Sequence, residues 1–175
     1  MVFTELLKKR RSVRKYSSGP LAEDQIRIIT EAALLSPSSR NIRPWEFILV
    51  RDPDTLRYLS RAKEGAKMIA DAALAIVILG DTEKSDVWVE DCSIVASNIL
   101  LAVTDIGLGA CWVQIRNRFH SGTERAGDYV SARLGVPERF EVEAVIAVGR
   151  PEEKRPPLGE SDMDWSKVHQ ERFSA

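Results

Sequence analysis

The sequence predicts one domain of mixed helices and strands around a buried sheet. The chain has 175 residues, which suits a single domain. Helical and strand-like apolar patterns alternate along it, and one strand-like segment is apolar at every position, so it requires cover on both faces. The composition, 44% hydrophobic and 29% charged, is that of a packed globular protein.

The first third of the chain is predicted to contain two helices, a strand and the start of a third helix. A helix begins near Thr4 and ends before residues 17–20, whose Gly and Pro interrupt it. Residues 21–35 repeat apolar side chains at helical spacing and carry two acids in the first turn, where they suit the helix dipole. Residues 45–50 are aromatic and β-branched, which is typical of a strand. Pro53 suits the first turn of the next helix.

A fully apolar strand and a long apolar helix are predicted in the middle of the chain. Residues 73–79 are apolar throughout, which indicates a strand buried on both faces. Residues 87–106 carry apolar side chains on almost every helical face, as in a helix at the centre of a core or in a subunit interface. In a chain this short, the interface is the more economical explanation. The later elements are predicted as a strand at 110–115, a helix at 123–134, a strand at 141–149 and an extended arm at about 150–175, pinned near Trp165 and Val168.

Charge and cysteine content argue against several classes of protein. The net charge is −1, from 25 basic and 26 acidic residues, so no global charge favours nucleic acid or an anionic membrane as a partner. The N-terminus lacks the layout of a signal peptide and residues 94–111 are too polar to cross a bilayer, so we expect a cytoplasmic protein. Cys92 and Cys111 lie in apolar surroundings without a CxxC pair, which favours reduced core thiols over a metal site.

A basic cluster near the N-terminus is the first candidate for ligand binding. Arg10, Arg11 and Arg14 supply guanidinium groups and Ser12 supplies a hydroxyl. These groups suit the oxygens of a phosphate monoester. The alternative is a helix end that carries cations because they favour the helix dipole.

A polar loop just before the first strand is the second candidate. Residues 37–45 are dense in side-chain donors, among them Ser38, Ser39 and Asn41. Loops carry binding sites more often than strands do, but Ser, Asn and Pro are also ordinary turn formers. Both interpretations stay open for this loop taken alone.

Two further motifs follow in the second half of the chain. Residues 107–112 form a glycine turn that leads into a strand bearing Trp112, and glycines either admit a flat ligand or end a helix. Gly149, Arg150 and Lys154 place cations directly after a core strand, as a second phosphate clamp or a solvated arm. No GxGxxG follows a strand and no P-loop is present, so a nucleotide would be held by another device.

The order of these motifs resembles the nitroreductase family of FMN enzymes. Arg-Arg-Ser-x-Arg, Pro-Ser-Ser-x-Asn-x-x-Pro-Trp, Gly-Leu-Gly-x-Cys-Trp and Gly-Arg-Pro occur in this order over essentially the whole chain. The resemblance implies an α+β fold with a central, mostly antiparallel sheet flanked by helices. It also implies a single nitroreductase-like domain over residues 1–175 and an intertwined homodimer with FMN at the interface.

Carried over by motif, the resemblance assigns each cluster to a part of FMN. The N-terminal basic cluster would lie along the phosphate, ribityl chain and pyrimidine edge, and the polar loop would reach the flavin from the partner subunit. The strand after Gly-Leu-Gly would line the ring by its backbone, and the cations after the last strand would complete the phosphate grip. The cofactor-binding residues implied in this way are Arg10, Arg11, Ser12, Arg14, Ser38, Ser39, Asn41, Trp112, Val113, Gly149, Arg150 and Lys154.

The activity that the resemblance implies is that of an FMN-dependent oxidoreductase. The flavin takes a hydride from NAD(P)H and passes electrons to a small organic acceptor of the nitro or quinone type. Both substrates would stack on the same flavin face, so we expect ping-pong turnover, and no acid–base pair is assigned. A cation beside the pyrimidine edge, for which we favour Arg14, would stabilise the reduced flavin.

Two features depart from the family pattern. Val113 and Gln114 stand where many members have small residues, commonly glycines, and residues 116–118 (Arg-Asn-Arg) are unusually basic. These departures concern the nicotinamide and acceptor pocket rather than the FMN site. The basic loop has two open interpretations, an anionic acceptor or solvated surface arginines.

Three other functions stay open from the sequence. A flavin-binding protein without turnover would use the same clusters. A branch of the family that dehalogenates its substrate or degrades flavin is the second, although such branches usually carry lid segments for which this chain has little room. A basic N-terminal arm that binds nucleic acid is the third, and it is disfavoured because the basic run is short and lacks interleaved aromatic residues.

Overall fold

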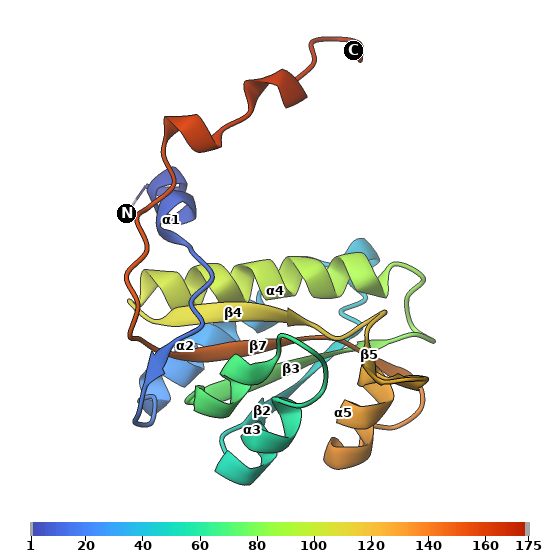
Figure 1. Ribbon diagram of the computed structural model, residues 1–175. Helices are drawn as coiled ribbons and strands as arrows, with labels where there is room; N and C mark the ends of the chain where they lie inside the picture. Colours follow the sequence, from blue (N-terminus) through green and yellow to red (C-terminus); the bar gives the residue numbers. More distant parts are fainter. Residues whose placement is uncertain (1, 174–175) are drawn as a thin grey trace.

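The computed structural model describes residues 2–173, in which helices cover both faces of one antiparallel sheet (Figure 1). Strand β2 pairs with β3, β3 with β7, and β7 with both β4 and the short β1, and every one of these pairs is antiparallel. The predicted α+β fold with a mostly antiparallel sheet is therefore confirmed. The strands are β1 (Tyr16–Ser17), β2 (Trp45–Val50), β3 (Leu74–Asp81), β4 (Gly109–Gln114) and β7 (Phe140–Pro151), and a separate hairpin consists of β5 (Phe119–Ser121) and β6 (Glu124–Arg125).

The helices form two layers, one on each face of the sheet. Helices α2 and α4 pack on one face, and α3, the 3-10 helix η2 and α5 pack on the other. Helix α1 and the C-terminal arm lie outside this sandwich (Figure 1). The helices are α1 (Phe3–Lys9), α2 (Glu23–Leu34), α3 (Pro53–Leu59), α4 (Trp88–Asp105) and α5 (Ala126–Leu134), and the 3-10 helices are η1 (Ser39–Asn41), η2 (Lys67–Asp71), η3 (Glu160–Asp162) and η4 (Trp165–Lys167).

Strand β3 shows why the sheet has a core on each side. All eight of its residues are buried. Leu74, Ile76 and Ile78 face α2 and α4, whereas Ala75 and Val77 face α3 and α5, because successive side chains of a strand point to opposite faces. Each large side chain buried in this way contributes about 1.5–3 kcal/mol. The apolar run at 73–79 is thus a strand buried on both faces, as the sequence predicted.

Helix α4 is amphipathic in its surroundings although its sequence is apolar on most faces. Cys92, Val95, Ile99 and Val103 are completely buried against the sheet. On the opposite side Ile94 is 43% exposed, so this apolar side chain is only partly covered within the chain. The half of the helix that the core does not need is therefore available for an interface.

Two helix starts follow from local chemistry. Asp52 caps α3, because its side chain accepts a hydrogen bond from the backbone N–H of Thr55 at 2.8 Å and Pro53 occupies the first turn. Helix α5 begins at Ala126, later than the predicted residue 123, because Glu124 and Arg125 pair in the β5–β6 hairpin instead.

The C-terminal arm follows β7 and projects away from the sandwich (Figure 1). The sequence led us to expect an arm pinned near Trp165 and Val168. Within the chain this expectation is wrong, because the two side chains are 66% and 58% exposed. The apolar residues of the arm therefore have no cover in one copy of the protein.

The cysteine prediction is confirmed. Cys92 and Cys111 are both free and buried, and burial raises the pKa of the Cys92 thiol to about 12. Within residues 2–173, no cluster of His, Cys, Asp and Glu is suited to a metal ion. The helices described there are also too short or too polar to span a membrane.

Candidate functional site

The two basic segments predicted to bind phosphate lie side by side. The backbone N–H of Leu158 donates to the carbonyl of Lys8 at 2.9 Å, and that of Glu152 donates to the carbonyl of Lys15 at 3.0 Å. Strand β1 pairs with the end of β7 directly beyond them. This pairing brings the clusters around residues 10–14 and 150–154 together, although they are far apart in the sequence.

The N-terminal cluster is held against β4 by tight packing. The backbone N–H of Val13 donates to the carbonyl of Ala110 at 2.9 Å, next to a parallel bridge between Ser12 and Ala110. A Cβ at Gly109 would lie 2.8 Å from the Val13 side chain, and one at Gly149 would lie 2.8 Å from Tyr16. Both glycines are therefore required for the N-terminal segment to approach the sheet, and a ligand contact by Gly149 stays a prediction.

A cavity of about 290 Å³ opens between the two basic segments and the C-terminal end of α4. Lys9, Arg11, Lys154 and Arg155 are among its lining residues, with Thr104 from α4. Arg11 donates to the carbonyl of Pro156 at 2.5 Å and Arg155 pairs with Glu153. The cavity therefore has basic walls formed by segments from both ends of the chain.

Most cations at this end lack a counter-charge. Within residues 2–173, no ion pair or side-chain hydrogen bond involves the charged groups of Arg10, Arg14, Arg150 or Lys154. Unneutralised cations repel one another, so an anion placed among them is stabilised. The donor set suits a phosphate group such as that of FMN, because guanidinium groups form paired, charge-assisted hydrogen bonds with phosphate oxygens.

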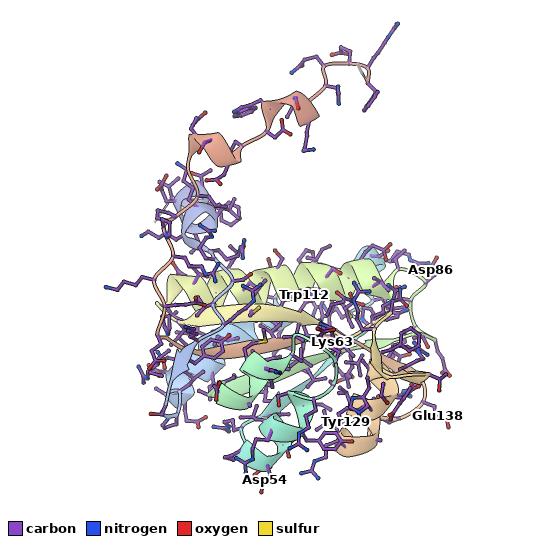
Figure 2. All side chains as sticks on the ribbon, in the orientation of Figure 1. Asp54, Lys63, Asp86, Trp112, Tyr129 and Glu138 are labelled. Atoms are coloured by element: carbon purple, nitrogen blue, oxygen red, sulfur yellow. The ribbon has the colours of Figure 1, made fainter. Side chains whose placement is uncertain are left out.

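Cys111 marks the point on β4 where cations from three segments converge. Burial raises the pKa of its thiol, and Arg14, Arg155 and Lys63 oppose the rise. Lys63 lies below Trp112 in Figure 2, on the side of the sheet that carries α3. The sequence prediction missed Lys63, because it stands in a loop between α3 and η2 with no motif around it.

The polar loop predicted to contact the flavin lies at the opposite end of α4. The backbone N–H of Ser39 donates to Oδ1 of Asp91 at 2.8 Å, and Asp91 is 2% exposed. The hydroxyl of Ser38 accepts from the backbone of Arg43 at 2.9 Å, and Oδ1 of Asn41 accepts from the Arg43 side chain at 2.9 Å. Both Asn41 and Arg43 have positive φ, so these side-chain contacts hold the loop in an unusual shape.

In one copy of the chain, the two halves of the predicted site lie at opposite ends of α4. The polar loop is attached at Asp91, whereas the basic cavity includes Thr104. These positions are separated by about 20 Å along α4, at 1.5 Å per residue. Asp86, which pairs with Arg40 of the loop at 3.0 Å, lies at the end of α4 away from α1 (Figure 2).

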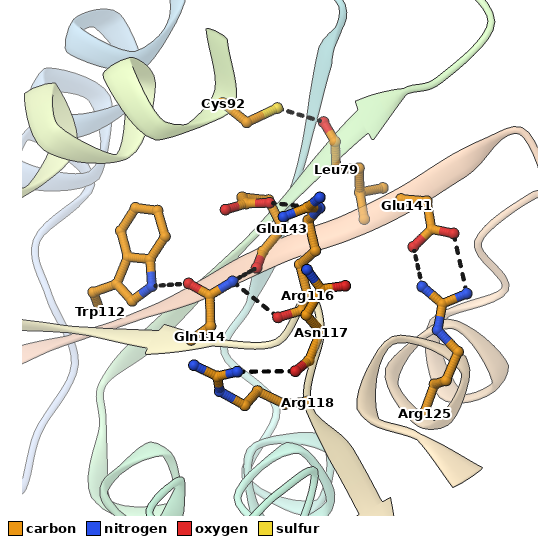
Figure 3. Close-up of polar contacts among 10 residues, drawn as sticks. All are labelled: Leu79, Cys92, Trp112, Gln114, Arg116, Asn117, Arg118, Arg125, Glu141 and Glu143. Carbon is orange, nitrogen blue, oxygen red and sulfur yellow. Dashed lines mark hydrogen bonds and ion pairs between the residues drawn. The ribbon is translucent and has the colours of Figure 1, made fainter. Parts of the chain in front are cut away.

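The predicted flavin-lining strand, β4, turns alternate residues to opposite faces. Val113 is buried in the core on the α3 side, and Trp112 is half-buried on the α4 side. The indole N–H of Trp112 donates to the amide oxygen of Gln114 at 2.9 Å (Figure 3). The Gln114 amide in turn donates to the carbonyls of Arg116 and Glu143, at 3.1 and 3.4 Å. The residue that departs from the family pattern thus ties the end of β4 to β7.

The comparisons with known proteins agree with this fold and arrangement. The model of the nitroreductase family matches residues 7–67 and 60–150. The chain belongs to the nitroreductase family. It is 33% identical over 174 residues to a protein of Archaeoglobus fulgidus provisionally named an NADH dehydrogenase/NAD(P)H nitroreductase, with 97% of each chain covered.

Two solved structures extend the similarity of this nitroreductase-family protein. An FMN-dependent nitroreductase from Clostridium difficile has a TM-score of 0.96 and 43% identity, covering 97% of this chain and 99% of its own. The NADPH:FMN oxidoreductase of Vibrio harveyi, solved with NAD+, has a TM-score of 0.81 at 24% identity, covering 98% and 78%. The second likeness shows the fold alone. The predicted family and fold are both confirmed.

Proposed function

We propose that this nitroreductase-family protein is an FMN-dependent oxidoreductase that takes a hydride from NAD(P)H and reduces a small organic acceptor of the nitro or quinone type. The observation that carries the proposal is the cluster of unneutralised cations around Arg10, Arg14 and Lys154, next to a strand with no dinucleotide fingerprint. One terminal phosphate matches such a cluster.

The residues that would hold FMN come from the segments described above. Arg10, with Arg150 and Lys154, would bind the phosphate, and Ser12 would donate its hydroxyl. The backbone of Trp112 and Val113 would line the flavin ring. Bound FMN supplies the two-electron chemistry that links NAD(P)H to the acceptor.

Arg14 would stabilise the reduced cofactor. The Arg14 guanidinium has no carboxylate partner within residues 2–173, and both Arg14 and Lys63 act to lower the pKa of the Cys111 thiol. A cation beside the pyrimidine edge interacts more strongly with an anionic ring than with a neutral one. Arg14 thereby raises the affinity for the reduced state more than that for the oxidised state.

Turnover is proposed to follow a ping-pong scheme. Val113 and Cys111 are buried, so the ring would contact this strand segment through its backbone. Both substrates would use the same exposed flavin face, so the oxidised nicotinamide must leave before the acceptor binds. The chain supplies position and charge in this scheme, and no acid–base pair is assigned.

The active form is proposed to be a homodimer with the site shared between copies. An antiparallel, two-fold arrangement of α4 would place the polar loop of one copy beside the basic cavity of the other. Met163, Trp165 and Val168 of the arm are all more than 40% exposed and would be covered by the second copy. Ser38, Ser39 and Asn41 would then complete the partner's site.

Equilibrium titration of the apo-protein tests the cofactor proposal. We expect one FMN per chain and weaker binding of FAD, because the cations match a single terminal phosphate. FAD bound as tightly as FMN would contradict the proposal. Anaerobic mixing of the FMN-loaded protein with NADH and NADPH then separates an enzyme from a flavin-binding protein, since only the enzyme bleaches the flavin absorbance and recovers it when a nitroaromatic compound or a quinone is added.

A further inference from the structure

Strand β7 contains an irregularity that turns a carboxylate into the protein interior. Ile78 pairs with Ala144 and Leu79 pairs with Val142, so Glu143 between them has no partner on β3. An extra residue of this kind is a β-bulge, which re-aims a side chain. Glu143 is only 3% exposed as a result.

The carboxylate of Glu143 is incompletely satisfied. Within residues 2–173, its Oε2 is the one buried side-chain nitrogen or oxygen atom without a hydrogen-bond partner. The Nε of Arg116 lies 4.0 Å from Oε2 and is the cation that faces it (Figure 3). Two residues of α4 also interact with Glu143: the Glu90 carboxylate raises the pKa of Glu143, and the Glu143 charge raises the pKa of the Cys92 thiol. Burial raises the pKa of Glu143, and Arg116 and Gln114 oppose the rise.

Arg116 is held inward at the start of the basic loop 116–118. Its backbone N–H donates to the carbonyl of Glu143 at 3.0 Å, and its guanidinium lies 5.6 Å from the centre of the Trp88 ring. The side chain is 34% exposed, so it can reach solvent if its counter-charge is removed. Arg118, two residues later, is exposed and donates to the carbonyl of Asn117.

We propose that Glu143 is a titratable positioning residue that sets whether Arg116 is available to an anionic acceptor. When Glu143 is ionised, its charge holds the Arg116 guanidinium inward against Trp88. When Glu143 is protonated, Arg116 has lost its counter-charge and pairs with a carboxylate on the acceptor. The proposal rests on the function proposed above and names its substrate class as organic acceptors that carry a carboxylate.

The physical basis is competition between two carboxylates for one guanidinium. An arginine and a carboxylate form charge-assisted hydrogen bonds. Burial removes water from the Glu143 carboxylate, and its Oε2 gains no hydrogen bond in exchange. A small acceptor with a carboxylate offers Arg116 a partner of better geometry than one 4.0 Å away. Protonation of Glu143 removes the competing negative charge. The kcat/KM for the anionic acceptor therefore rises, whereas that for a neutral acceptor does not.

The test compares 4-nitrobenzoate with 4-nitrobenzamide as acceptors for the FMN-loaded protein between pH 5.5 and 8.5. The ratio of the two kcat/KM values removes effects common to both substrates. We expect this ratio to rise about fivefold as pH falls through the pKa of Glu143, which burial raises, as for an ion pair with one partly exposed partner. Glu143→Gln should hold the ratio at its low-pH value throughout, and Arg116→Gln should hold it low throughout.

Glu141→Gln is the matched control. Glu141 lies two residues earlier on β7 and pairs with Arg125 at 2.9 Å at the surface (Figure 3). This variant should keep the wild-type pH profile. A wild-type ratio that does not change with pH, or a folded Glu143→Gln variant with the wild-type profile, would overturn the proposal. If Glu143→Gln does not fold, the wild-type and Arg116→Gln profiles decide the question.

Fluorescence separates this proposal from the proposed function. The intensity of Trp88, taken as the difference between the wild-type protein and Trp88→Phe, should change with pH as Arg116 leaves the ring. It should not change with pH in Arg116→Gln. A titrating Trp88 signal without NAD(P)H-dependent turnover would contradict the proposed function alone, and turnover with no Trp88 titration would contradict the positioning role of Glu143.

Discussion

The two ends of helix α4 differ in how their charges are compensated. At the N-terminal end, the polar loop is internally complete: Arg40 pairs with Asp86 at 3.0 Å, and Ser39 donates to the buried Asp91. At the C-terminal end, Arg10 and Lys154 carry no ion pair within residues 2–173. The polar loop at the N-terminal end is held by contacts within the chain, whereas the C-terminal end carries cations that have no counter-charge within residues 2–173.

This difference supports the proposal that each site is divided between two copies of the chain. The polar loop is held by its own hydrogen bonds, so it can be presented to a second copy at little conformational cost. The basic end requires an anion to relieve the repulsion among its cations. In the proposed homodimer, each copy would supply the preformed polar loop to one site and the basic end of α4 to the other.

Removal of the arm should have the largest effect on this arrangement. A chain ending at Leu158 keeps the hydrogen bond to Lys8 but loses Met163, Trp165 and Val168. Because each large side chain buried in the partner contributes about 1.5–3 kcal/mol, we expect dimer dissociation to become at least about 100-fold easier and FMN to be lost. Sedimentation at micromolar concentrations measures this. Lys167→Ala, on the same arm, is the control, and a truncated chain that stays dimeric and yellow would show that the arm does not hold the copies together.

Replacement of Arg10 should weaken FMN binding at the C-terminal end of α4 without affecting the polar loop. Arg10→Ala removes a charge-assisted hydrogen bond to the phosphate, worth roughly 1.5–3 kcal/mol, so the FMN dissociation constant should rise about 10- to 150-fold. Isothermal titration of the apo-protein measures it. Arg27→Ala removes an exposed arginine on α2 that pairs with Glu31 and should leave the affinity unchanged. Equal losses in both variants would show that the effect is not local.

Replacement of Arg14 should act on the redox equilibrium rather than on affinity. A cation at the pyrimidine edge stabilises the reduced, anionic ring more than the neutral oxidised ring. Arg14→Ala should therefore lower the midpoint potential and slow flavin reduction by NAD(P)H, with a smaller loss of FMN affinity than in Arg10→Ala. Spectroelectrochemical titration decides the assignment: an unchanged potential with looser FMN would make Arg14 another phosphate or ribityl anchor.

Replacement of Glu143, which lies near Trp88 at the N-terminal end of α4, should have the smallest effect, a change in stability. Because the folded-state pKa of Glu143 is raised, its contribution to stability is present below the ordinary Glu pKa and is lost as pH rises through the folded value. As pH rises from 5 to 8, the free energy of unfolding of Glu143→Gln should therefore increase by about 1 kcal/mol relative to that of the wild type. Urea unfolding at the two pH values measures the gain. The same gain in Glu141→Gln would assign it to general charge and not to the buried carboxylate.

The sequence was informative wherever a pattern alone determines structure. The strand at Trp45–Val50 has the predicted bounds, and α4 differs from its prediction by one residue at each end, because apolar periodicity dominates in buried elements. The basic clusters were also identified from residue type. Their meeting was not visible in the spacing, since it depends on the pairing of β1 with β7.

The features that were missed depend on tertiary contacts. The bulge at Glu143 follows from the register between β3 and β7, which alternation cannot reveal. Lys63 acts on the pKa of Cys111 because the loop after α3 brings its charge near β4. Trp165 was expected to be pinned because it is apolar, yet apolarity does not say which copy of the chain supplies the cover.

A mixed dimer tests the shared site most directly. One copy carries Arg10→Ala and the other Asn41→Ala, each with a different affinity tag so that only the mixed species is purified. If each site joins the basic end of one copy to the polar loop of the other, both changes fall in one site and the second site is fully wild type. We predict one FMN per mixed dimer bound with wild-type affinity. Two weakened sites, neither with wild-type affinity, would contradict the account, because each site would then lie within a single chain.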